Sequence, residues 1–308
     1  MSTTLILIQI LNGLQLGVIL FLIAAGLTLI FGVMGFINLA HGVQYMLGAY
    51  LAVWLHGITG SFVAAFLLAL PGALLLGLVL EFLVFRHLYA RDHLTQVLAT
   101  FGVILFLNEL VKVLFGPAAL SVEPPQFLDW SFVIVDGLMY PAYRVALIAA
   151  GLIVAVGLWY VITRTRVGML IRAGATDPEM VSALGVDVRR LFLVVFGVGA
   201  MLAGLAGVLA APVFSVEPGM GDDLLIVAFV VIIIGGVGSI RGAFVAALLV
   251  GLVDTLGRTL VTDGLRLALD AAAANQIGPA IASMMIYVLM ACVLFWRPEG
   301  LFAARVAR

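Results

Sequence analysis

Three amide side chains share one side of the first apolar run of this sequence. Gln9, Asn12 and Gln15 are spaced three residues apart, so a helix would bring them onto one face. Amide groups placed in this way can line a path for a polar solute, or they can hydrogen-bond a neighbouring helix. The spacing fits both roles, and we take Asn12 and Gln15 as candidate residues of a translocation pathway.

A glycine-rich break follows, with polar side chains around it. Residues 32–42 (GVMGFINLAHG) interrupt a long apolar stretch, and glycine allows the backbone to unwind there. Free amides at a helix end favour a bound anion, and free carbonyls favour a cation. Asn38, His41 and Gln44 add side-chain donors and acceptors, so they are further candidates for the pathway. The alternative is that this break is only a turn between two helices.

A second break of similar composition lies at residues 235–242 (GGVGSIRG). Transporters often carry such breaks at corresponding points of two structural repeats. The two segments are short, so they raise the hypothesis of an internal repeat without deciding it.

The sequence carries no pattern typical of an enzyme. His41 has no second ligand at metal spacing, and neither a His-Glu-x-x-His run nor a Gly-x-Ser-x-Gly elbow occurs. A Walker A loop needs Lys followed by Ser or Thr, and the one lysine, Lys112, is not followed by either. We therefore expect no catalytic residue, no metal and no cofactor, and any ATP hydrolysis on another polypeptide.

Charged residues of the apolar runs are spaced to pair locally, Glu109 with Lys112 and Asp254 with Arg258.

The composition indicates that most of the chain lies in a membrane. Hydrophobic residues make up 65% of the 308 and charged residues only 10%, against roughly 45–50% and about 25% in a soluble domain. So much apolar surface must face a bilayer, where only helices and closed barrels satisfy the backbone. The runs are continuous and near the ~20 residues of a spanning helix, whereas barrel strands alternate. The sequence predicts an all-α, polytopic transmembrane helix bundle, with residues 1–308 as a single domain.

Nine apolar runs can be drawn, and we expect eight or nine of them to span the membrane. The second run is short and contains glycine, so it either spans or re-enters. The runs lie at residues 5–33, 43–58, 62–85, 94–115, 142–163, 191–213, 224–239, 242–261 and 277–296.

The basic residues predict the orientation, because they favour cytoplasmic loops. Eleven of the fifteen lie in loops or tails that would share one side: Arg86, Arg91, Arg164, Arg166, Arg172, Arg189, Arg190, Arg241, Arg297, Arg305 and Arg308. The opposite loops carry fewer basic residues together with six acidic ones: Glu123, Asp129, Asp136, Glu217, Asp222 and Asp223. This asymmetry gives an outside N-terminus and an inside C-terminus.

The long cytoplasmic connection, residues 164–190, carries a helix pattern of its own. Asp177 suits an N-cap, Pro178 suits the first helical position, and Gly185 suits the residue just past the end. Glu179 falls in the first turn, where the helix dipole favours an anion. The connection therefore predicts a helix of about two turns.

The apolar face of this short helix needs a surface to pack on. Met180, Val181 and Leu184 fall on one side at helical spacing, and a two-turn helix is marginal alone in water. The face packs either on the helix ends of the same chain or on a cytoplasmic partner.

This connection resembles a known family. Residues 172–186 (RAGATDPEMVSALGV) are similar to the coupling segment of bacterial importer permeases, and more narrowly to the branched-chain amino-acid (LIV-type) permeases of ATP-binding-cassette importers. Val181 stands where alanine is expected in that family. Further stretches agree: residues 38–42 (NLAHG), 48–50 (GAY), 203–209 (AGLAGVL), 218–221 (PGMG), 235–239 (GGVGS) and 297–302 (RPEGLF). The resemblance covers nearly the whole chain and points to the LivH-like subunit rather than its longer partner.

The resemblance implies a multi-pass protein of the bacterial cytoplasmic (inner) membrane that translocates leucine, isoleucine or valine. Its partners would be a homologous second permease subunit, two cytoplasmic ATPase subunits and a periplasmic substrate-binding protein, with no nucleic acid. The implied ATPase-coupling residues are Arg172, Asp177, Pro178, Glu179, Met180, Val181, Leu184 and Gly185. Two alternatives stay open: a related permease for urea, an amide or a sugar, and a self-sufficient channel or secondary transporter, which would not need a docking helix.

Overall fold

The apolar runs of the sequence form helices in the computed structural model, which describes residues 3–135 and 138–302. All nine predicted runs are confirmed as helical, with ends close to those expected. They are α1 (Thr3–Met34), α2 (His41–Thr59), α3 (Phe62–Leu83), α4 (His93–Phe115), α5 (Ala142–Arg164), α8 (Val188–Ala210), α9 (Met220–Gly235), α10 (Ile240–Leu265) and α11 (Ala271–Trp296).

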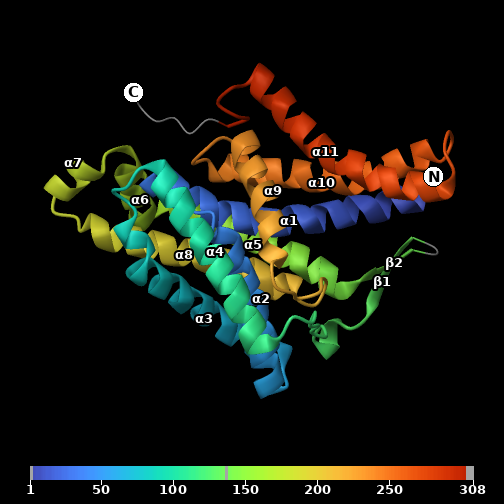
Figure 1. Ribbon diagram of the computed structural model, residues 1–308, viewed down its shortest axis with the longest axis horizontal. Coiled ribbons are helices and arrows are strands. Elements are labelled where there is room, and N and C mark those ends of the chain that lie inside the picture. Colours follow the sequence, from blue (N-terminus) through green and yellow to red (C-terminus); the bar gives the residue numbers. More distant parts are fainter. Residues whose placement is uncertain (1–2, 136–137, 303–308) are drawn as a thin grey trace.

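The connections hold structure that the apolar pattern does not predict. After α5 the chain forms α6 (Arg166–Thr176) and then α7 (Pro178–Ala183). Before α5 lies an antiparallel hairpin of β1 (Ser131–Val135) and β2 (Leu138–Pro141). Single 3-10 turns occur at η1 (Phe85–His87) and η2 (Gln126–Leu128). The hairpin and α7 lie at opposite ends of the molecule, and α1 and α10 run along its long axis (Figure 1).

Seven of the described helices are long and apolar enough to cross a membrane, which supports the predicted all-α membrane bundle. Of the nine predicted runs, α2 and α9 are not among the seven. The α9 helix has only 16 residues, fewer than the ~20 that span a bilayer. The α2 helix carries His41, Gln44 and His56 within its 19 residues.

Capping side chains fix where most helices begin. The N-cap residue of seven helices accepts a hydrogen bond from the amide three residues on: Ser61, Asp92, Thr165, Asp177, Asp187, Ser239 and Asp270. At Asp92, hydrogen bonds from the Thr95 hydroxyl and amide lower the pKa of the carboxyl, which keeps the cap charged. Helices α2 and α9 begin without a capping side chain, at Ala40 and Gly219.

Glycines allow the central helices to lie backbone against backbone. Gly48 of α2 faces Gly204 of α8, and Gly251 of α10 faces Gly17 of α1. A side chain at Gly48, Gly17 or Gly251 would overlap the neighbouring backbone, and one at Gly204 would overlap the Ala73 side chain of α3. Close packing of small residues is the main attraction available between helices in lipid, so these contacts hold the core together.

Helices α2 and α9 begin inside the bundle. Gly42 and Gly221, the second residue of each helix, contact each other through their backbones. Both helices then run at a steep angle to α1 (Figure 1).

The contact between α2 and α9 is part of a packing pattern that relates two sets of three helices. Helix α1 packs on α8 and α10, and α8 packs on α1 and α3. The pattern supports an internal repeat in which α1–α3 correspond to α8–α10. In that pairing the break at residues 32–42 corresponds to residues 211–219, between α8 and α9. This pairing does not match the break at residues 32–42 to residues 235–242, because the second break follows α9 instead of preceding it.

Candidate functional site

A cavity of about 600 Å³ lies among α1, α5, α9, α10 and α11. Its volume falls within the roughly 300–1,000 Å³ typical of small-molecule sites. Leu16, Val227 and Ile286 are among the apolar residues of its wall. Its polar wall is formed by Asn12, Gln15, Arg144, Asp223, Asp254, Thr255, Arg258, Ser283 and Tyr287. The structure thus brings two of the sequence candidates, Asn12 and Gln15, to a cavity.

Asn12 positions an arginine at this cavity. Its Oδ1 accepts a hydrogen bond from Arg144 Nη1 at 2.9 Å and one from the Tyr140 hydroxyl at 3.3 Å. Tyr140 belongs to β2, and Arg144 is the third residue of α5. The cavity therefore adjoins the hairpin, at the end of the molecule that lies opposite α7 (Figure 1).

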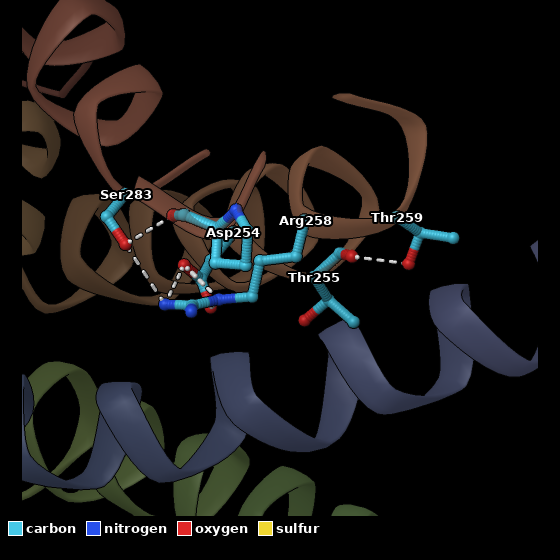
Figure 2. A network of polar contacts seen from close by, with 6 residues as sticks. Asp254, Thr255, Arg258, Thr259 and Ser283 are labelled. Carbon is cyan, nitrogen blue, oxygen red and sulfur yellow. Dashed lines mark hydrogen bonds and ion pairs between the residues drawn. The ribbon is translucent and has the colours of Figure 1, made fainter. Parts of the chain in front are cut away.

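A second arginine of the cavity is neutralised by its own helix. Arg258 Nε lies 3.0 Å from each carboxylate oxygen of Asp254, which confirms the predicted local pair. The Arg258 guanidinium also donates to Ser283 Oγ of α11 at 3.2 Å, and Ser283 in turn donates to the Pro279 carbonyl. Figure 2 shows the arginine held between the Asp254 carboxylate and Ser283, with α1 passing alongside. This network ties α10 to α11 and leaves little free charge.

The other pathway candidates, Asn38, His41 and Gln44, lie elsewhere, at the break of residues 32–42 and in the first turn of α2. Asn38 and His41 are 0% exposed and Gln44 is 4% exposed, and none of the three lines the cavity. His41 Nε2 is 3.1 Å from the Ile23 carbonyl of α1, and the Gln44 side chain lies beside the His41 ring. Within the described residues, neither amide atom of Asn38 has a hydrogen-bond partner.

Side chains of α4 hold the unwound backbone of this break. The Ile37 amide donates to Gln96 Oε1 at 3.2 Å, and the Leu39 amide donates to Thr100 Oγ1 at 3.4 Å. Unwound backbone inside a bundle needs such partners, because lipid offers none. The break is therefore a buried structural element with polar groups of its own, unlike an exposed loop.

At the opposite end of the molecule, the short helix predicted within residues 164–190 is confirmed as α7. Asp177 Oδ1 accepts a hydrogen bond from the Met180 amide at 2.8 Å, and Gly185 follows the helix with φ of +86°. Its apolar face is divided: Val181 is 5% exposed, whereas Met180 and Leu184 are 58% and 77% exposed. Val181, the residue that departs from the family's alanine, packs on the chain itself.

The sequence did not reveal Arg144 and Asp223 as residues of the cavity. Arg144 lies 132 residues from its partner Asn12. One local signal was present. A cation in the first turn of a helix opposes the helix dipole, so Arg144 stands at an unfavourable position for a purely structural residue. Asp223 looked like a normal first-turn carboxylate of α9 and gave no such signal.

The chain matches a family model described as "Branched-chain amino acid transport system / permease component" over residues 9–294. It is similar to the high-affinity branched-chain amino acid transport system permease protein BraD of Pseudomonas aeruginosa, with 29% identity over 95% of this chain and 94% of BraD. It is also 30% identical to the LivH permease protein of Salmonella typhimurium, over 80% of this chain and 84% of LivH. The LivM permease protein of Escherichia coli is 29% identical over 93% of this chain and 68% of LivM. No solved structure matches the chain. On these findings, the chain belongs to the family of branched-chain amino acid transport system permease components.

Proposed function

We propose that this chain is the membrane-spanning permease subunit of an ATP-binding-cassette importer, and that it moves leucine, isoleucine and valine inward across the bacterial cytoplasmic membrane. The observation that carries the proposal is the family match over residues 9–294. BraD and LivH, both described as high-affinity branched-chain amino acid permeases, resemble the chain over most of its length.

In this proposal the hairpin end faces outward and the α7 end faces the cytoplasm. The arginine distribution supports that orientation. Helices α2 and α9 each complete a crossing together with the irregular segment that precedes them, which gives nine crossings, an outside N-terminus and an inside C-terminus.

The motor of the importer is a pair of separate ATPase subunits that dock on α7. Met180 and Leu184 supply the apolar contact, and Arg172 and Glu179 supply charge around it. Exposed apolar side chains on a capped helix are unfavourable in water, which supports a protein partner for them. The other partners are a second permease subunit, for which the similarity to LivM is the support, and a substrate-binding protein at the hairpin end.

Cargo in this proposal enters the cavity beside Asn12 and Gln15 and then passes the buried break with Asn38, His41 and Gln44. An amino-acid zwitterion must shed water to cross, so protein groups must replace that water. The unpaired amide of Asn38 supports this role, because a buried polar group without a partner is costly unless something binds it.

Reconstitution tests the proposed function. Proteoliposomes that contain both permease subunits and the ATPase subunits should accumulate radiolabelled leucine only when ATP and the loaded binding protein are both present. Leucine flux without the ATPase subunits would instead identify a self-sufficient transporter. ATP-driven uptake of urea or a sugar without leucine would show that the substrate assignment is wrong.

A further inference from the structure

Two of the charged residues that line the cavity pair with each other, and two do not. Asp254 and Arg258 neutralise each other through a bidentate contact. Arg144 has no carboxylate within ion-pair distance among the described residues, and its hydrogen bonds go to the uncharged oxygens of Asn12 and Tyr140. Asp223 makes no hydrogen bond or ion pair with any residue that the structure describes. One cation and one anion of the cavity are therefore left uncompensated.

Both side chains are accessible to a ligand, since Arg144 is half-buried and Asp223 is exposed. Asp223 lies in the first turn of α9. The neighbouring Asp222 accepts a hydrogen bond from Asn108 of α4 at 3.1 Å, so it is engaged on another side of α9. Arg144 opposes the dipole of α5, and the Asn12 oxygen at 2.9 Å holds its guanidinium in place. The Asn12 side chain therefore positions a guanidinium that has no carboxylate partner among the described residues.

We propose that the cavity binds a zwitterionic amino acid with an apolar side chain, with Arg144 on its carboxylate and Asp223 on its ammonium group. This inference rests on the proposed function and adds the residues that recognise the cargo. A guanidinium forms two parallel hydrogen bonds with a carboxylate, which a lysine in the same place would not. Leu16, Val227 and Ile286 form the part of the wall that takes the apolar side chain.

The site selects against ligands that carry only one of the two charges. An amine would leave Arg144 without an anion, and a carboxylic acid would leave Asp223 without a cation. Removing one member of a charge-assisted hydrogen bond costs roughly tenfold or more in affinity.

Thiol protection in the assembled membrane complex tests this proposal without the binding protein. The complex, in nanodiscs, carries Cys292→Ala and Thr255→Cys, since Thr255 lines the cavity. Leucine should slow modification of the new thiol, whereas 3-methylbutylamine and 4-methylpentanoate should not. Arg144→Gln and Asp223→Asn should each raise the leucine concentration needed for protection by at least about tenfold. Arg144→Lys should recover only part of the loss.

Lys112→Gln is the matched control. Lys112 lies on α4, 2.6 Å from Glu109, and does not line the cavity, so its loss should leave protection by leucine unchanged. Equal protection in Arg144→Gln and the parent, or equal protection by the amine and leucine, would overturn the proposal. A complex that accumulates leucine in proteoliposomes but shows no leucine protection in nanodiscs would overturn the site while leaving the function intact. If the Arg144→Gln complex does not assemble, protection of the parent complex by 3-methylbutylamine and 4-methylpentanoate tests the proposal instead.

Discussion

At the scale of single residues, glycines decide whether this bundle can form. Gly48 on α2 and Gly204 on α8 bring two backbones into contact at the centre of the molecule. The same helix offers an internal comparison, because Gly57 has no neighbouring atom where a Cβ would lie. Two identical substitutions on one helix can therefore separate crowding from helix propensity.

Gly48→Ala should destabilise the protein, because the added methyl group overlaps the Gly204 backbone and neither backbone can move independently. Overpacking of this kind costs about 1–3 kcal/mol, so thermal unfolding in detergent should occur several degrees lower. Gly57→Ala should unfold at the same temperature or slightly higher, because alanine favours a helix over glycine. Equal stability of the two variants would show that α2 and α8 do not pack as described.

At the scale of elements, sequence and structure agree best where the signal is local. Continuous apolar runs and the capping residue Asp177 predict helices, since both signals depend on neighbours in the chain. Local signals do not predict the cavity, because Asn12 contacts Arg144 only through tertiary packing. The hairpin was missed for the same reason: it is short, and it docks through Tyr140 on α1.

Helix α7 shows both outcomes within one short element. Asp177, Pro178 and Gly185 predict its start and end correctly. The sequence pattern alone did not show that its apolar face divides, with Val181 packed inward and Met180 and Leu184 exposed. That division makes the docking proposal more specific.

Met180→Ala combined with Leu184→Ala should weaken association with the ATPase subunits by at least about tenfold, because two apolar contacts are lost from the interface. Co-purification at graded ATPase concentrations measures this. Leu267→Ala, which removes a 91% exposed leucine elsewhere, should bind normally. Val181→Ala should also keep binding, because Val181 faces the chain itself. Normal ATPase binding by the double variant would remove α7 as the docking helix.

At the scale of the whole molecule, two unlike ends lie on opposite sides of one helix bundle (Figure 1). One end holds the hairpin and the cavity that Arg144 and Asp223 line. The other holds an arginine-rich connection and a capped helix with exposed apolar side chains. We propose that cargo enters at the first end and that ATP hydrolysis acts on the second.

The sidedness of these two ends tests that claim most directly. Single cysteines replace Ser121, between α4 and the hairpin, and Ser182, on α7, in a Cys292→Ala background; both serines are exposed. In right-side-out membrane vesicles, an impermeant thiol reagent should label Ser121→Cys and leave Ser182→Cys unmodified until the vesicles are opened. Labelling of Ser182→Cys in closed vesicles, with Ser121→Cys protected, would contradict the account, because the docking helix would then face away from any cytoplasmic ATPase.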